Sequence, residues 1–254
     1  MHFSNAIVRR PGRSIVNGLS MTASGPPVYE KALEQHAQYV KALGYCGLEV
    51  KVLDCLEGYP DATFVEDVAI LTPDCAIITA PGAPSRRGEV EAIKPVLNPY
   101  YSCIECIHTP GTLEGGDLMQ VGNHLYIGLS QRTNEAGARQ LTAILEKYGI
   151  TASTVPVVNF LHLKTAVTYV GQNHLMVAEG FALPEELQSF KAFQVPIAEL
   201  PAANCILIND KIMMSAGFPR TQEQLGLIGT EIVAVDISEF AKIDGGLTCL
   251  SLRF

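Results

Sequence analysis

The sequence contains no tryptophan, and only 17% of its 254 residues are charged. It also lacks an excess of positive charge, because 26 Asp and Glu outnumber 18 Lys and Arg and give a formal net charge of −8. A chain of this charge is a poor partner for the phosphate backbone of nucleic acids and favours small cations. We therefore expect no nucleic-acid partner.

No apolar run approaches the length of a membrane-spanning helix. Near the N-terminus, Arg9 and Arg10 are followed by Pro11 and Gly12, so no signal-peptide core is expected there. Seven cysteines leave at least one thiol unpaired within a monomer, and a chain of this length needs no disulfide framework. These absences predict a cytoplasmic protein with no membrane association.

What the sequence does contain is a weak repeat of hairpins. Each unit combines a polar start, an apolar strand, a turn and a second apolar strand, and the strongest turn signal is Gly122-Asn123. The first four units cover residues 64–79, 113–128, 161–178 and 203–216. A fifth begins near residue 245 and ends the chain.

Helical patterns fill several gaps between the hairpins, at residues 29–43, 134–148 and 221–228. Thr221 and Gln224 predict a capping box for the third helix, and Gly149 a left-handed end for the second. A hairpin with one helix cannot bury both its faces, so the units must pack around a shared centre. We predict one α/β domain, residues 1–254, of five units in a ring. An ordinary α/β sheet is the alternative.

The polar starts of the units carry the residues of chemical interest. If the first strand of each unit faces the axis, these starts converge at one end of the ring. The residues predicted to become neighbours are Glu66, Asp67, Glu114, Asp117, His162, Asn204 and Cys249.

A thiol, an imidazole and a carboxylate stand at three of these starts. Cys249 follows Gly245-Gly246, His162 lies between leucines, and Glu114 precedes paired glycines. A cysteine or histidine in apolar surroundings is usually a core residue. At matching repeat positions, however, the three meet the requirements for a nucleophile with an oriented acid/base partner. We predict these roles for Cys249, His162 and Glu114.

Charged residues of both signs accompany this group. Asp61, Glu66 and Asp67 offer carboxylates, which bind planar guanidinium groups through paired hydrogen bonds, although a solvated turn is the plainer interpretation. Arg86 and Arg132 offer cations for a substrate carboxylate, although arginines at helix starts are commonly surface residues.

Taken together, five motifs resemble the dimethylarginine dimethylaminohydrolases of the bacterial type, and the resemblance runs over residues 6–254. The family belongs to the guanidine-modifying superfamily, and the resemblance implies a five-bladed pseudo-symmetric α/β propeller of ββαβ-like units. The motifs are Phe64-Val65-Glu66-Asp67, Ser85-Arg86-Arg87-Gly88-Glu89, Glu114-Gly115-Gly116-Asp117, Leu161-His162-Leu163-Lys164-Thr165 and Asp244-Gly245-Gly246 with Cys249.

The resemblance also implies a reaction. Cys249 would attack the guanidinium carbon of dimethyl- or monomethylarginine, His162 would protonate the departing amine, and Glu114 would orient and charge His162. Water would then release citrulline from a covalent thiouronium, with no cofactor and no metal. The implied substrate contacts are Asp61, Glu66 and Asp67 at the guanidinium, Arg86 and Arg132 at the α-carboxylate, and Leu19 and Ile243 at the amino-acid end, under a lid at residues 14–27.

Three other interpretations remain open. An arginine deiminase would act on unmethylated arginine, but deiminases resemble this chain around His162 with an aspartate where Lys164 stands, and they carry an inserted helical domain. A metal site is the second, with Cys103, Cys106 and His108 as ligands, although a second cysteine pair is missing. The third is a non-catalytic arginine-binding protein, which would need no catalytic cysteine. A homodimer is the default expectation.

Overall fold

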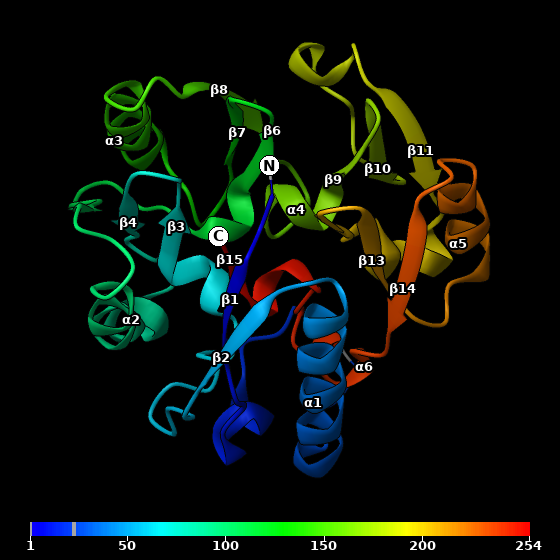
Figure 1. The fold of residues 1–254 in the computed structure, drawn as a ribbon, viewed down its shortest axis with the longest axis horizontal. Coiled ribbons are helices and arrows are strands. Elements are labelled where there is room, and N and C mark those ends of the chain that lie inside the picture. Colours follow the sequence, from blue (N-terminus) through cyan, green and yellow to red (C-terminus); the bar gives the residue numbers. More distant parts are fainter. Residues whose placement is uncertain (1, 22–23) are drawn as a thin grey trace.

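The computed structural model describes residues 2–21 and 24–254. Five three-stranded sheets stand around a common centre (Figure 1). Within each sheet the middle strand pairs antiparallel with the strand nearer the centre and parallel with the outer one. The predicted five-bladed α/β propeller is confirmed.

Four of the sheets take their strands in chain order. The strands are β3 (Ala69–Leu71), β4 (Ala76–Ile78) and β5 (Ile104–Cys106); β6 (Leu118–Val121), β7 (His124–Leu129) and β8 (Thr151–Pro156); β9 (Val167–Gly171), β10 (His174–Ala178) and β11 (Lys191–Val195); and β12 (Ile206–Ile208), β13 (Lys211–Ser215) and β14 (Glu231–Val235).

The fifth sheet joins the two ends of the chain. Its inner strand is β15 (Leu252–Arg253), which pairs antiparallel with β1 (Asn5–Arg9), and β1 pairs parallel with β2 (Glu49–Leu53). The sequence repeat placed the fifth unit at the C-terminus alone. The structure shows that its other two strands come from the N-terminus, so this sheet closes the ring (Figure 1).

In four of the five sheets, a helix lies in the crossover connection from the middle strand to the outer strand, and a parallel pair requires such a connection. In the remaining sheet, the crossover between β10 and β11 contains only the 3-10 turn Glu185–Leu187. The long helices are α1 (Tyr29–Tyr45), α2 (Val90–Leu97), α3 (Glu135–Glu146) and α5 (Pro219–Gly226), and the short ones are α4 (Leu163–Ala166) and α6 (Ser238–Ala241). Among the described residues, no helix is long and apolar enough to cross a membrane.

The capping box predicted at Thr221 is wrong. Helix α5 begins two residues earlier, at Pro219, whose fixed φ suits the first turn. Thr221 is instead buried inside the helix, where its backbone N–H and hydroxyl donate to Glu199 Oε2 at 2.8 and 2.7 Å. Gly149, by contrast, has the predicted left-handed φ of 69°.

Apolar clusters fill the spaces beside the sheets. On β4, Ile77 shares a cluster with Leu141 and Leu145 of α3, whereas Ile78 lies in another cluster with Ile93 of α2. This alternation follows from the two-residue period of a strand. The sheets are therefore covered on both faces, and the polar unit starts are left to the axis of the ring.

Candidate active site

Short helical turns from four of the units meet on the axis. They are the 3-10 turns Val65–Val68, Gly115–Asp117 and Thr248–Leu250, together with α4, and each contacts another of the group. A pocket of about 150 Å³ opens beside them. Of the residues predicted for the site, it is lined by Leu19, Asp61, Asp67, Arg86, Glu114, Arg132, His162, Ile243 and Cys249.

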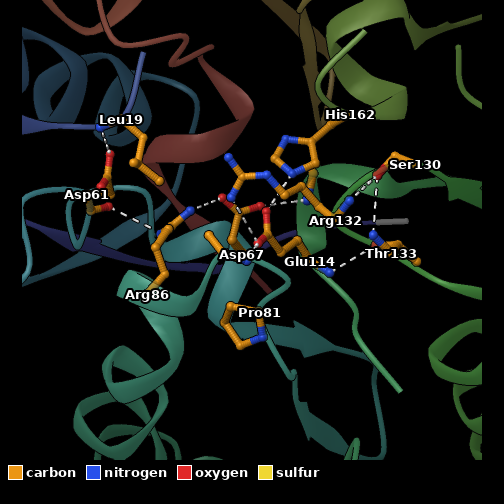
Figure 2. A network of polar contacts seen from close by, with 12 residues as sticks. Leu19, Asp61, Asp67, Pro81, Arg86, Glu114, Ser130, Arg132, Thr133 and His162 are labelled. Atoms are coloured by element: carbon orange, nitrogen blue, oxygen red, sulfur yellow. Dashed lines mark hydrogen bonds and ion pairs between the residues drawn. The ribbon is translucent and has the colours of Figure 1, made fainter. Parts of the chain in front are cut away.

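Glu114 and His162 form a buried pair at the pocket wall (Figure 2). Glu114 Oε2 lies 2.7 Å from His162 Nε2, and its other oxygen accepts from the Ala83 N–H at 3.1 Å. The Glu114 N–H in turn donates to Thr133 Oγ1 at 3.1 Å. The carboxylate is thus held on both oxygens and fixes the orientation of the imidazole.

Several negative charges surround the His162 ring. Burial disfavours the charged imidazole, but Asp67, the hydrogen bond to Glu114 and the charge of Asp117 outweigh it and raise the His162 pKa to about 9. His162 is therefore protonated at neutral pH. It can act as a general acid before it acts as a base.

Cys249 is half-buried in the turn that precedes β15. Its Sγ accepts a hydrogen bond from the Gly246 N–H at 3.3 Å. Burial, followed by the charges of Glu66 and Asp67, raises the Cys249 pKa to about 12, although Gly246 and Lys164 oppose the shift. Without a bound cation the thiol is thus neutral.

The paired glycines of the motifs are required by close approaches. A Cβ on Gly116 would lie 2.6 Å from His162 Nδ1, and one on Gly246 would lie 2.5 Å from Asn204 Cγ. Side chains at these positions would displace the imidazole or the turn that carries Cys249. The glycines therefore allow neighbouring units to meet.

Arg86 is bound on all sides by protein. Its guanidinium donates to Asp67 Oδ2 at 2.5 Å, to Glu89 Oε2 at 2.8 Å and to the Phe64 carbonyl at 2.9 Å. Arg86 itself is only 4% exposed. Asp67 also accepts from the Gly116 N–H at 2.9 Å, and these partners lower its pKa despite burial. Arg86 therefore holds Asp67 in place and has little capacity left for a ligand.

Arg132 differs from Arg86 in its surroundings. Its closest acidic atom is Glu114 Oε1, 3.6 Å from Nη1, and its side chain is 19% exposed. In Figure 2 it projects toward His162 and Asp67. Arg132 is thus the pocket cation with room for an anionic group.

The N-terminal segment closes the opposite side of the pocket. The Leu19 N–H donates to Asp61 Oδ1 at 3.0 Å, and the Met21 N–H donates to Asp244 Oδ2 at 2.6 Å (Figure 2 shows the first contact). Ile243 is buried beside Gly18. Residues 22 and 23 of the lid expected at 14–27 lie outside the described residues.

Glu66 does not line this pocket. Its carboxylate binds Lys164, accepts from the Thr248 hydroxyl at 2.8 Å and lies 3.3 Å from Arg253 Nη2. It faces a separate cavity of about 240 Å³ on the axis. The structure thus separates Glu66 from Asp61 and Asp67, with which the sequence had grouped it.

One cluster in the described part of the chain has the composition of a metal site. Asp67, Glu114 and His162 place ligand atoms within 4.8 Å of one another. Asp67 Oδ2 is taken by Arg86, however, and Glu114 Oε2 by His162. The cluster is an internally paired acid/base group rather than an open set of ligands.

Comparisons with known proteins agree with this geometry. A sequence model of the family described as N,N dimethylarginine dimethylhydrolase, eukaryotic, matches residues 20–190. The N(G),N(G)-dimethylarginine dimethylaminohydrolase of Pseudomonas aeruginosa is 48% identical, over 99% of this chain and 100% of that protein. The one from Streptomyces coelicolor is 38% identical over 100% of this chain and 98% of that protein.

Among solved structures, the C249S mutant of the Pseudomonas aeruginosa protein, complexed with citrulline, superposes with a TM-score of 0.98. It is 47% identical, and the match covers 100% of both chains. The chain belongs to the dimethylarginine dimethylaminohydrolase family. The N-terminal domain of the cyanobacterial arginine dihydrolase ArgZ, at 17% identity and a TM-score of 0.89, shares the fold over 100% of this chain and 97% of that one.

The sequence predicted that Asp117 would lie among the site residues but gave it no role, and it missed Ser130. Asp117 is fully buried, and it accepts from the Leu163 N–H at 2.9 Å and from the Ser130 hydroxyl at 2.7 Å. Ser130 Oγ in turn accepts from the Arg132 N–H at 2.9 Å. Asp117 therefore connects the backbone beside His162 to the turn that carries Arg132. Its place beside Glu114 in the Glu-Gly-Gly-Asp motif was the available signal.

We expect Asp117→Asn to lower kcat and raise KM together. Asparagine has only one acceptor oxygen, so either the Leu163 N–H or the Ser130 hydroxyl loses its buried acceptor, at a cost of about 1–3 kcal/mol. The segments that carry His162 and Arg132 are then held less firmly. The predicted loss in kcat/KM is roughly 10- to 100-fold. Asp74→Asn, which removes an exposed acid in a hairpin turn, is the matched control. A change in thermal stability alone would contradict the positioning role.

Proposed function

We propose that this protein hydrolyses methylated arginine, dimethyl- or monomethylarginine, to citrulline and the methylamine. The observation that carries the proposal is the meeting of a thiol, a protonated imidazole and buried carboxylates around one small pocket in a member of this family. The citrulline complex of the Pseudomonas relative supports the product.

The substrate supplies what the free site lacks. A guanidinium bound beside Asp67 and Cys249 brings a positive charge next to the sulfur. A nearby cation lowers the pKa of a thiol and so promotes the Cys249 thiolate. The Cys249 thiolate then attacks the guanidinium carbon held against it. A poor electrophile is thus met by a strong nucleophile that forms when the substrate binds.

His162 handles the protons of both half-reactions. In the first, its protonated ring donates to the departing dimethylamine or methylamine, and a thiouronium remains on Cys249. In the second, the now neutral ring removes a proton from water, which attacks the same carbon. The bond from this carbon to the Cys249 sulfur then breaks, which releases citrulline and the free Cys249 thiol. Glu114 stabilises the charged ring in each cycle and keeps it oriented.

The remaining contacts serve substrate binding. Arg132 is proposed to bind the α-carboxylate, and Asp61, Leu19 and Ile243 to enclose the amino-acid end. Asp67 is proposed to hold the guanidinium directly. For Arg86 and Glu66, which the sequence predicted as substrate contacts, we propose action through their partners, because Arg86 binds Asp67 and Glu66 pairs with Lys164.

Citrulline formation tests the function directly. Purified protein would receive asymmetric dimethylarginine, monomethylarginine and arginine side by side, without added metal or cofactor. Preference for the methylated substrates is the expected result. A preference for arginine would favour a deiminase-like activity, and no citrulline from any substrate would reject the proposal.

Lys164 is the observation that bears on the deiminase alternative. The position that carries an acid in deiminases holds a lysine here, and this lysine neutralises Glu66. This position therefore supplies no carboxylate for the nitrogens of an unsubstituted guanidinium. This arrangement favours methylated substrates.

We expect alkylation of Cys249 by iodoacetamide to accelerate about tenfold per pH unit, without a plateau below about pH 10. The reason is the pKa of about 12, so that the reactive thiolate remains a minor species through this range. The rate would be followed by intact mass, with Cys249→Ser to identify the labelled thiol. A plateau near pH 8 would contradict the expectation.

Mutations of the two arginines that line the pocket should have different effects, one on substrate binding and the other on stability. Arg132→Ala is expected to raise KM roughly 10- to 100-fold, because one charge-assisted contact is worth about 1.5–3 kcal/mol, with little change in Tm. Arg86→Ala should instead destabilise the fold by about 3–5 kcal/mol, since Asp67 and Glu89 become unpaired buried charges. Steady-state kinetics and thermal unfolding of both variants check this. Equal Tm values would refute the anchoring role of Arg86.

We also infer a cytoplasmic location and a homodimer. All seven cysteines are unpaired in the structure, which suits a reducing compartment. Sedimentation measurements on the purified protein would test the dimer.

A further inference from the structure

Two cysteines on neighbouring strands lie opposite each other, outside the proposed active site. Cys75 directly precedes β4 and Cys103 directly precedes β5, whose first residues Ala76 and Ile104 pair in parallel register. The Ala76 N–H donates to the Cys103 carbonyl at 3.1 Å, which extends the ladder to the two cysteines. Neighbouring strands lie about 4.8 Å apart, within the Cα separation of about 4.4–6.8 Å that a disulfide spans.

The two thiols also share one face of the sheet. Cys75 and Cys103 both pack in the cluster formed with α3, whereas Ile104 and Cys106 pack in the cluster formed with α2. Because strand side chains alternate, Cys106 faces away from the pair although it is only three residues from Cys103. This distribution also rules against the metal site suggested for Cys103 and Cys106.

Tyr148 and Lys147 complete the environment of the pair. The Tyr148 hydroxyl lies 2.9 Å from Cys103 Sγ and also interacts with the Cys75 thiol, which in turn interacts with Cys103. Lys147, 2.7 Å from Glu105 Oε1, adds a positive charge near both sulfurs. Both sulfurs therefore lie near a hydroxyl and a charged ammonium group.

The two sulfurs differ in access to solvent. Cys75 is fully buried, and burial raises its pKa. Cys103 is only half-buried. A small oxidant from solvent therefore reaches Cys103 first, and Cys75 is placed behind it as the resolving thiol.

We propose that Cys75 and Cys103 form a reversible disulfide when the protein meets a peroxide. The Cys103 thiolate attacks one oxygen of hydrogen peroxide and breaks the O–O bond, which gives a sulfenic acid and, with the thiol proton, one water. The Cys75 sulfur then attacks the Cys103 sulfur, the S–O bond breaks, and a second water leaves with the Cys75 proton. The two thiols lose two electrons, peroxide gains them, and a dithiol reductant reverses the bond.

The bond would affect stability rather than the active site. It closes the chain between residues 75 and 103, which contains Arg86 and α2, and so restricts the unfolded chain. The opposite end of β4 leads to Thr79, whose hydroxyl donates to the Asp67 carbonyl at 2.6 Å and is left unchanged. We expect the Tm of the oxidised Cys249→Ser protein to be several degrees higher than that of the same variant reduced by dithiothreitol.

The test uses the full chain with Cys249→Ser, because the active-site thiol would also react. The folded variant is exposed to hydrogen peroxide and then denatured for thiol titration and intact mass. The expected result is a loss of two thiols and of the mass of two hydrogen atoms, both restored by dithiothreitol. Unchanged thiols, or a gain of oxygen mass in place of the cross-link, would overturn the proposal.

Single substitutions in the same background identify the partners. Cys106→Ser should still lose two thiols, because Cys106 faces the other side of β5, and Cys55→Ser should do the same. Cys103→Ser should lose none, and its Tm in the reduced state shows whether it folds. If Cys103→Ser still loses two thiols, or if Cys106→Ser stops the reaction, the assigned pair is wrong.

Discussion

Cys249→Ser is expected to reduce citrulline formation by at least about 10⁴-fold. A serine hydroxyl at neutral pH forms far less oxyanion than a thiol forms thiolate, and the guanidinium carbon is too poor an electrophile for a neutral oxygen. The substitution is nearly isosteric, so the Gly246 N–H retains an acceptor and the turn should fold unchanged. Substrate binding should therefore survive, and calorimetric titration would detect it.

Intact mass after mixing with substrate distinguishes the chemistry. The unaltered protein should pass through a covalent adduct on Cys249, whereas Cys249→Ser should show none. Cys55→Ser, a half-buried thiol beside Glu57, is the matched control and should keep full activity. Activity retained in Cys249→Ser would remove this residue from the mechanism.

His162→Ala should lower kcat by about 10²–10⁴-fold, as expected for a residue that serves as acid and then as base. The two steps can be separated with a substrate whose leaving group is a thiol, since this group departs with little need of a proton. Such a substrate should still form the covalent adduct, which then persists because no base activates water. His108→Ala, an exposed histidine, is the control.

The pH dependence of stability provides an independent check on His162. Its folded pKa of about 9 exceeds the value of 6.5 expected for an unperturbed ring, so protonation stabilises the folded state. This contribution is fully present below about pH 6.5 and is lost as pH rises through about 9. The Tm difference between the unaltered protein and His162→Ala should shrink over that window. A constant difference would show that Asp67 and Glu114 do not raise the His162 pKa.

Local signals in the sequence were sufficient for the repeat, the hairpin turns and three of the four long helices among the described residues, but not for α2. Apolar alternation with turn residues such as Gly122 marks a strand pair wherever it occurs, and Gly149 marks a helix end, because these depend on neighbouring residues alone. The recurrence of polar starts then predicted that Glu114, His162 and Cys249 would meet. These features were determined by the sequence by itself.

Only the tertiary structure decided which charges face the substrate pocket. Asp61, Glu66 and Asp67 look equivalent in sequence, yet Lys164 and Arg253 bind Glu66 at a separate cavity outside the substrate pocket. The guanidinium of Arg86 is paired with Asp67 and Glu89, whereas Arg132 makes one longer contact with Glu114 and can still bind a ligand. The same holds for the closure of the fifth sheet by β1. Each outcome depends on partners distant in the chain, whose positions are set by packing and which no local pattern encodes.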